Sequence, residues 1–147
     1  GNRNAVVFPR ARVEGAPYDF SFSGLKSAVL NHINHAHMMG EEINVPDLMA
    51  SFQYAVVDVL TSHAVEAAKN LGYDKVAIAG GVASNSALRA EMKEACEKAG
   101  LKFYYPSPIF CTDNAAMIGV AGYYEYINGT RSGWDLNAVP NLKLGER

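Results

Sequence analysis

The sequence contains few cysteines and no long apolar run. Cys96 and Cys111 are the only two cysteines in 147 residues, too few for a disulfide framework. A reducing, cytoplasmic location is therefore the simpler expectation. Since no apolar stretch approaches the length needed to cross a bilayer, we expect no membrane partner.

Charge is also sparse. Charged residues make up 19% of the chain and the formal net charge is −2, which is unlike the strongly basic balance of a free-standing nucleic-acid-binding domain. A nucleic-acid partner met through a local patch, or with another subunit, stays open. What the chain does have is apolar content: 49% of its residues are apolar, enough for the core of one ordinary domain and unlike a disordered protein.

The spacing of apolar residues predicts an α/β fold. Residues 25–40, 46–72 and 85–100 have the period of amphipathic helices, and a fourth helix is expected from Thr112 or Asp113 to Tyr126. Short apolar runs at 75–79 and 101–105 predict strands, the first buried on both faces. Strand and helix alternate here, which is typical of an α/β layer with a parallel sheet. Residues 5–23 predict short strands or a hairpin.

Two junctions between a strand and a helix could bind a ligand. Gly80 and Gly81 follow the first strand, and Asn85 opens the next helix. Glycines let a ligand approach the backbone closely, and a helix N-terminus offers free N–H donors. Local physics alone slightly favours a plainer interpretation, a tight turn with an Asn or Ser N-cap.

Asp113 marks the second junction, between the second strand and the fourth helix. Spacing alone favours a helix cap, but a carboxylate here could also bind a metal or phosphate. Because the carboxyl ends of parallel strands share one sheet edge, we expect the two junctions to lie together.

Four ordered motifs resemble those of one family. They are Asp19-Phe-Ser-Phe-Ser-Gly-Leu-Lys26, Ala50-Ser-Phe-Gln53, Gly80-Gly-Val-Ala-Ser-Asn85 with Ala87-Leu-Arg89 behind it, and Cys111-Thr-Asp-Asn-Ala-Ala-Met-Ile118. Together they resemble the TsaD family of tRNA threonylcarbamoyl transferases, formerly described as O-sialoglycoprotein endopeptidase or glycoprotease.

The resemblance implies a fold, a reaction and partners. It implies a ribonuclease-H-like lobe of an actin/Hsp70-like (ASKHA) fold, with a mixed sheet flanked by helices. Members transfer a threonylcarbamoyl group from threonylcarbamoyl-adenylate to the exocyclic amine of the adenosine next to the anticodon in tRNA. In bacteria they act with the subunits TsaB and TsaE.

The resemblance also assigns site residues. Asn85, Gly80 and Gly81 match residues that line the substrate pocket. Asp113 matches the aspartate that holds one divalent metal, iron or zinc, together with two histidines of an HxxxH motif.

That HxxxH motif does not occur in this sequence, nor does the family's Ser-Gly-Gly-His-Thr loop. We therefore expect residues 1–147 to be the carboxy-terminal lobe only, without the amino-terminal lobe that carries HxxxH. Such a lobe should be inactive alone and should not retain the metal, because a single carboxylate gives little affinity. Its missing partner lobe should leave apolar surface exposed, which favours self-association.

Two alternatives remain open from the sequence. The older family description implies a metalloprotease-type glycoprotease, although no general base like the Glu of HExxH is offered. The other is a non-catalytic, actin-like nucleotide-binding scaffold.

Overall fold

The computed structural model describes residues 1–143, which divide into two compact units. The first comprises Gly1–Thr112 and the second starts at Asp113. No helix in the described range is long and apolar enough to cross a membrane.

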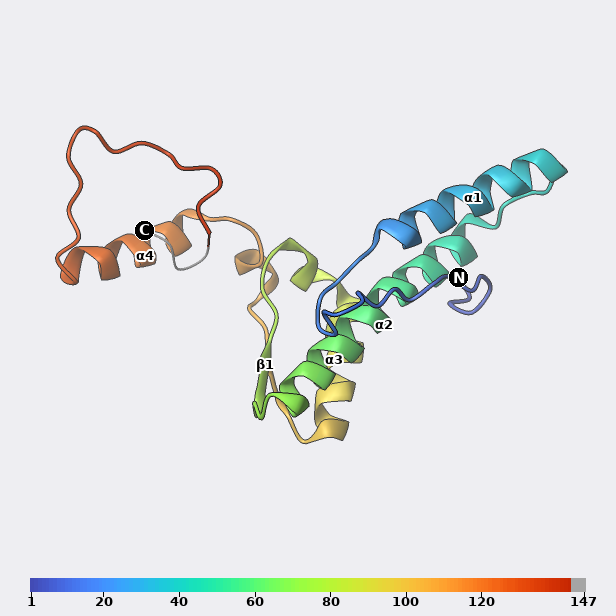
Figure 1. The fold of residues 1–147 in the computed structure, drawn as a ribbon, viewed down its shortest axis with the longest axis horizontal. Helices are drawn as coiled ribbons and strands as arrows, with labels where there is room; N and C mark the ends of the chain where they lie inside the picture. The colour runs from blue at the N-terminus through green and yellow to red at the C-terminus, as the bar shows by residue number, and fades with distance from the viewer. Residues whose placement is uncertain (144–147) are drawn as a thin grey trace. The chain divides into compact units, whose positions relative to one another are not determined.

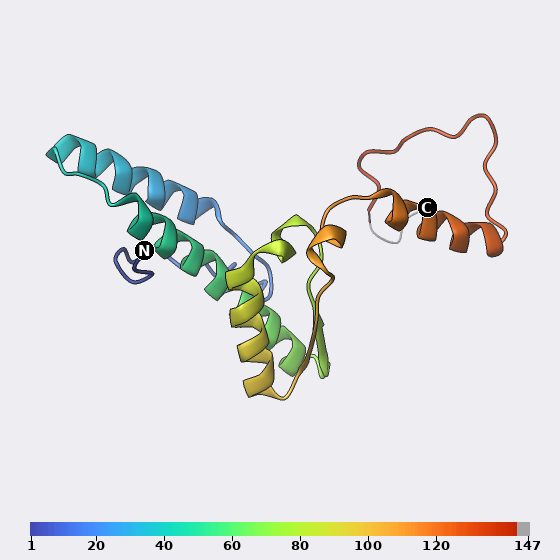
Figure 2. The same ribbon diagram turned by 180° about the vertical axis from the view of Figure 1, so that it is seen from behind.

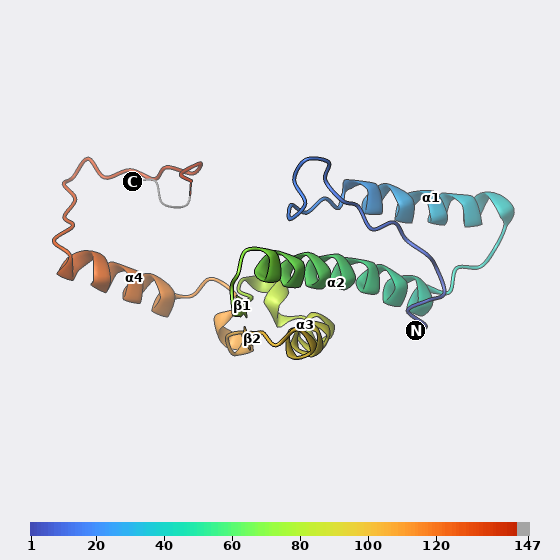
Figure 3. The ribbon, with the colours of Figure 1, turned by 60° about the horizontal axis from the view of Figure 1, so that its bottom comes forward.

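Two long helices form one part of the first unit. Helix α1 (Ser23–Met39) ends at Gly40, whose φ of 68° gives the left-handed cap that glycine adopts most readily. Helix α2 (Val45–Asn70) begins after Asn44, whose side chain accepts a hydrogen bond from the Asp47 backbone N–H. The two helices run side by side (Figures 1 and 3) and share an apolar cluster with the preceding segment, formed by Phe8, Leu25, Leu48 and Ala55. Both predicted helices are confirmed.

A β-α-β element forms the other part. Strand β1 (Lys75–Ala77) and strand β2 (Lys102–Tyr104) pair in parallel, and helix α3 (Ser86–Ala99) connects them. Helix α3 packs against α2 beside the strands (Figure 2). The core between these elements consists of Val57, Ala68, Val76, Leu88, Met92 and Cys96. The α/β class and the parallel pairing are thus confirmed, and the sheet in the described residues has two strands.

Burial explains the chemistry of one cysteine. Cys96 has no exposed surface, and this burial raises the pKa of its thiol. A thiol kept protonated in this way packs as a small apolar side chain.

Two expectations about strands are wrong. Residues 5–22 form no regular strand and contain only an isolated antiparallel bridge between Val13 and Ala16, because prolines and glycine interrupt the segment. Strand β1 is buried on one face only. Val76 points into the core formed with α2 and α3, whereas its neighbours Lys75 and Ala77 are exposed.

The second unit contains helix α4 (Ala115–Ile127), none of whose residues is buried. Its N-cap is Asn114, whose side chain accepts a hydrogen bond from the Met117 backbone N–H at 3.0 Å. The helix therefore begins two to three positions later than predicted from Thr112 or Asp113, and Asp113 is not its cap.

Ser51 fastens the N-terminal segment to α2, so we expect Ser51→Ala to be destabilising. The buried Ser51 hydroxyl accepts a hydrogen bond from the Val6 N–H at 3.1 Å and donates one to the Asn2 carbonyl oxygen at 3.2 Å. Removing it should lower the free energy of unfolding by about 1–2 kcal/mol, because the Val6 N–H and the Asn2 carbonyl oxygen lose their hydrogen bonds to a buried hydroxyl. Urea denaturation measures this. Ser62→Ala, at an exposed position of the same helix, is the control and should change little; equal effects would contradict the role of Ser51.

Candidate ligand-binding junction

The two glycines after β1 leave their backbone open. Gly80 has a backbone φ of +85°, which residues with a side chain rarely adopt, and it precedes the short 3-10 helix η1 (Gly81–Ser84). Both glycines are exposed, and a Cβ built on Gly81 would meet only the Thr112 methyl group, at 4.0 Å. A ligand can therefore approach this backbone closely, as the sequence predicts for Gly80 and Gly81. Contact with a substrate stays a prediction.

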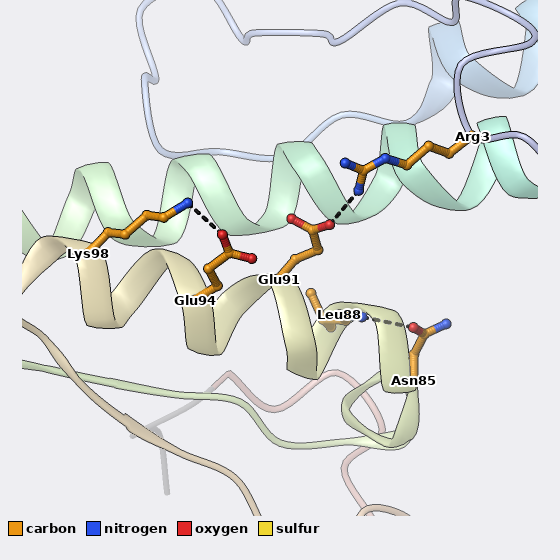
Figure 4. A network of polar contacts seen from close by, with 6 residues as sticks. All are labelled: Arg3, Asn85, Leu88, Glu91, Glu94 and Lys98. Atoms are coloured by element: carbon orange, nitrogen blue, oxygen red, sulfur yellow. Dashed lines mark hydrogen bonds and ion pairs between the residues drawn. The ribbon is translucent and has the colours of Figure 1, made fainter.

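Asn85 begins helix α3. Its Oδ1 accepts a hydrogen bond from the Leu88 backbone N–H at 2.9 Å (Figure 4). Its Nδ2 donates a hydrogen bond to Oε1 of Gln53, at 3.1 Å, on helix α2. The capping role that local physics predicts is confirmed. It leaves room for ligand binding, because the carboxamide has further hydrogen-bonding capacity.

A cavity of about 420 Å³ lies between α2 and the start of α3. Gln53 and Asn85 are among its polar lining residues, and Phe52, Val56 and Leu88 are among the apolar ones. An apolar pocket with a few polar groups on its walls is the usual form of a small-molecule site.

Arg89 ties together the two segments that follow β1 and β2. Its Nε donates a hydrogen bond to the Ala83 carbonyl oxygen of η1. One terminal nitrogen lies 2.9 Å from the Pro106 carbonyl oxygen and 3.1 Å from Sγ of the buried Cys111. The guanidinium also stacks over the Tyr105 ring, 4.7 Å from its centroid. A single side chain thus holds the glycine turn against the segment that leads to Thr112.

The outer face of α3 carries ordinary surface ion pairs (Figure 4). Glu91 pairs with Arg3 at 2.7 Å, and Glu94 accepts a hydrogen bond from Lys98 one turn later. The Lys98 ammonium lowers the pKa of Glu94, and Glu94 in turn raises the pKa of Lys98. These side chains are exposed, and such pairs stabilise proteins little.

Asp113 is exposed at the start of the second unit. Within residues 1–143, no three His, Cys, Asp or Glu side chains lie close enough together to hold a metal ion. One carboxylate does not make a metal site, so the residues described here do not fit a bound metal by themselves.

Gln53 and Arg89 are the residues of this region to which the sequence assigns no role. Each belongs to a motif named above, but a motif shows neither the partner of Gln53 on another helix nor the carbonyls that Arg89 reaches. For Arg89, the sequence signal is its spacing of four residues from Asn85, which places the two side chains one helical turn apart.

The family profile described as TsaD, tRNA N6-adenosine threonylcarbamoyltransferase, matches residues 1–120. The chain belongs to the TsaD family. The resemblance carried by the four motifs is thereby confirmed.

Curated TsaD relatives align with the whole chain. A tRNA N6-adenosine threonylcarbamoyltransferase of Clostridium botulinum (strain Hall) is 56% identical over 147 residues. The protein of the same name from Clostridium perfringens (strain 13) is 57% identical over the same length. In both cases the alignment covers 100% of this chain and 43% of the relative, so the chain spans less than half the length of these TsaD proteins.

Proposed function

We propose that this chain forms the carboxy-terminal lobe of an enzyme that modifies tRNA. The complete enzyme transfers a threonylcarbamoyl group from threonylcarbamoyl-adenylate to the exocyclic amine of the adenosine next to the anticodon. The observation that carries this proposal is the TsaD profile match over residues 1–120. The names of the clostridial relatives support it.

The lobe's part in the reaction is to bind and orient the adenylate. The open backbone at Gly80 and Gly81 admits the ligand close to the start of α3, whose dipole favours a negative group. Asn85 contributes hydrogen bonds at the rim of the neighbouring cavity. Positioning of this kind suits a weakly nucleophilic exocyclic amine, because much of the rate then comes from holding the two reactants together.

The wider setting follows from the same proposal. The lobe has the ribonuclease-H-like topology of an actin/Hsp70-like enzyme, and its parallel β-α-β element supports this. Asp113 supplies one ligand to an iron or zinc ion, and the other ligands come from polypeptide outside the described residues. The enzyme works in the cytoplasm with tRNA, TsaB and TsaE.

A chimera tests the function. These 147 residues replace the 43% that they match in the Clostridium perfringens relative. We expect the chimera, supplied with threonylcarbamoyl-adenylate and tRNA, to form the modified adenosine within about tenfold of the parent rate, since cores tolerate hydrophobic substitutions that keep their volume and pattern. Mass spectrometry of tRNA nucleosides measures the product.

The control is the 147-residue chain by itself, which should give no turnover. Turnover by the chain alone would contradict the requirement for a second lobe. A folded chimera without product would contradict the proposed function.

A further inference from the structure

We propose that Gln53 is a positioning residue: it accepts a hydrogen bond from the capped carboxamide of Asn85 and so holds the remaining Asn85 N–H in place as a hydrogen-bond donor to the ligand. This inference rests on the proposed function, because it assumes that Asn85 faces the adenylate. It goes further by giving Gln53 a role and by stating which kind of ligand atom Asn85 recognises.

The orientation of Asn85 follows from its cap. The Leu88 backbone N–H can only donate, so the Asn85 atom 2.9 Å away must be the acceptor Oδ1. The amide nitrogen Nδ2 therefore points the other way, toward Gln53. For the same reason Gln53 must present Oε1 rather than its own nitrogen to Asn85. The backbone of α3 thus determines which end of each amide faces the other, and the hydrogen bond to Gln53 restrains the Asn85 carboxamide at the end opposite its cap.

These two hydrogen bonds determine which hydrogen-bonding groups of Asn85 remain available to a ligand. Asn85 Nδ2 carries two hydrogens, of which one is directed at Gln53. The second hydrogen is left for a ligand, and Asn85 lines the cavity. The apolar walls contribute no hydrogen bonds. Asn85 therefore selects ligand groups that accept hydrogen bonds, such as a ring nitrogen or a ribose oxygen of the nucleoside.

Gln53 can be changed without disturbing the core. Its side chain is exposed, whereas the neighbouring Ser51 and Ala55 of α2 are buried. Substitutions of exposed helix residues usually change stability little. An effect on ligand binding can therefore be separated from an effect on folding.

The experiment uses the active chimera described above and compares Gln53→Leu with Gln53→Glu. Leucine removes the acceptor, so the Asn85 amide keeps its cap but loses the second hydrogen bond that holds its N–H in place. We expect the KM for threonylcarbamoyl-adenylate to rise about fivefold, as for the loss of one hydrogen bond. Glutamate keeps an acceptor for Asn85 Nδ2 and should restore most of the affinity. The value of kcat should stay within about twofold in both variants, because losing an interaction that is equally strong in the bound substrate and in the transition state raises KM alone.

Ser62→Leu is the matched control, an uncharged exposed residue of α2 outside the cavity, and it should leave KM unchanged. Asn85→Asp keeps the cap but removes the N–H donor. In the Asn85→Asp variant, Gln53→Leu should raise the KM by a smaller factor than it does in the parent chimera.

The outcomes distinguish the two proposals. An active chimera whose KM is unaffected by Gln53→Leu overturns the role of Gln53 and leaves the proposed function intact. A KM raised as much by Gln53→Glu as by Gln53→Leu also overturns it, since the acceptor would then not matter. A folded chimera with no transfer activity overturns the proposed function and this inference with it.

Discussion

Asp113→Asn should lower threonylcarbamoyl transfer by the active chimera by more than about a hundredfold. The reason is the proposed loss of a metal ligand. Mutating residues that merely support metal ligands typically costs about 10–100-fold, so loss of a ligand itself should cost more. Initial rates with saturating tRNA and adenylate measure the effect, and metal content by elemental analysis should fall in parallel.

The structure makes Asp113→Asn a clean test. Asn114, and not Asp113, caps helix α4, and Asp113 is exposed. Asparagine also has nearly the same size as aspartate. The thermal unfolding midpoint of the chain should therefore stay within about 2 °C, as for other exposed substitutions.

Two variants serve as controls. Asp135→Asn removes an exposed carboxylate of the same unit and should leave the rate unchanged. Asn114→Ala removes the cap of α4 and should destabilise that helix by about 1 kcal/mol while Asp113 is retained. Full activity and full metal content in Asp113→Asn would show that Asp113 is not a ligand.

The elements that the sequence predicts well are those fixed by local rules. The ends of α1 and α3 coincide with Gly40 and Gly100, which both adopt the left-handed conformation that glycine favours. Asn85 is recognisable as an N-cap because its side chain bonds a backbone N–H only three residues away. The parallel pairing of β1 and β2 follows from the single helix between them.

Predictions that depend on distant neighbours succeed less well. An apolar run such as residues 75–79 shows that a strand can be buried, but not whether a second layer covers its other face. Residues 5–22 alternate like a strand, yet side chains of α2 hold part of this segment instead, for example through Ser51. Gln53 meets Asn85 across 32 residues and Arg89 meets Cys111 across 22, separations that no local pattern shows.

Arg89→Ala should lower the free energy of unfolding of the chain by about 3 kcal/mol, because hydrogen bonds from a charged group are worth about 1.5–3 kcal/mol each. The variant loses the hydrogen bonds to the Ala83 and Pro106 carbonyls and the stacking on Tyr105. Arg89→Lys keeps the charge but cannot reach several acceptors at once, so it should restore only part of the stability. Urea denaturation monitored by circular dichroism gives the free energies of unfolding of the parent and the two variants.

A second arginine variant and hydrogen exchange distinguish the loss of the specific contacts of Arg89 from a general effect of removing an arginine. Arg3 also pairs with a carboxylate and lies over a tyrosine ring, but its ion pair with Glu91 is exposed, so Arg3→Ala should cost less than about 1 kcal/mol. Hydrogen exchange should rise in Arg89→Ala at the Asn85 and Cys111 amides, whose hydrogen bonds close η1 and the turn before Thr112. Equal protection at these amides in the parent and the variant would mean that the two segments hold their places without Arg89. If exchange rises at both together, Arg89 couples the glycine turn to the segment that leads to Asp113, and the two candidate junctions depend on one side chain.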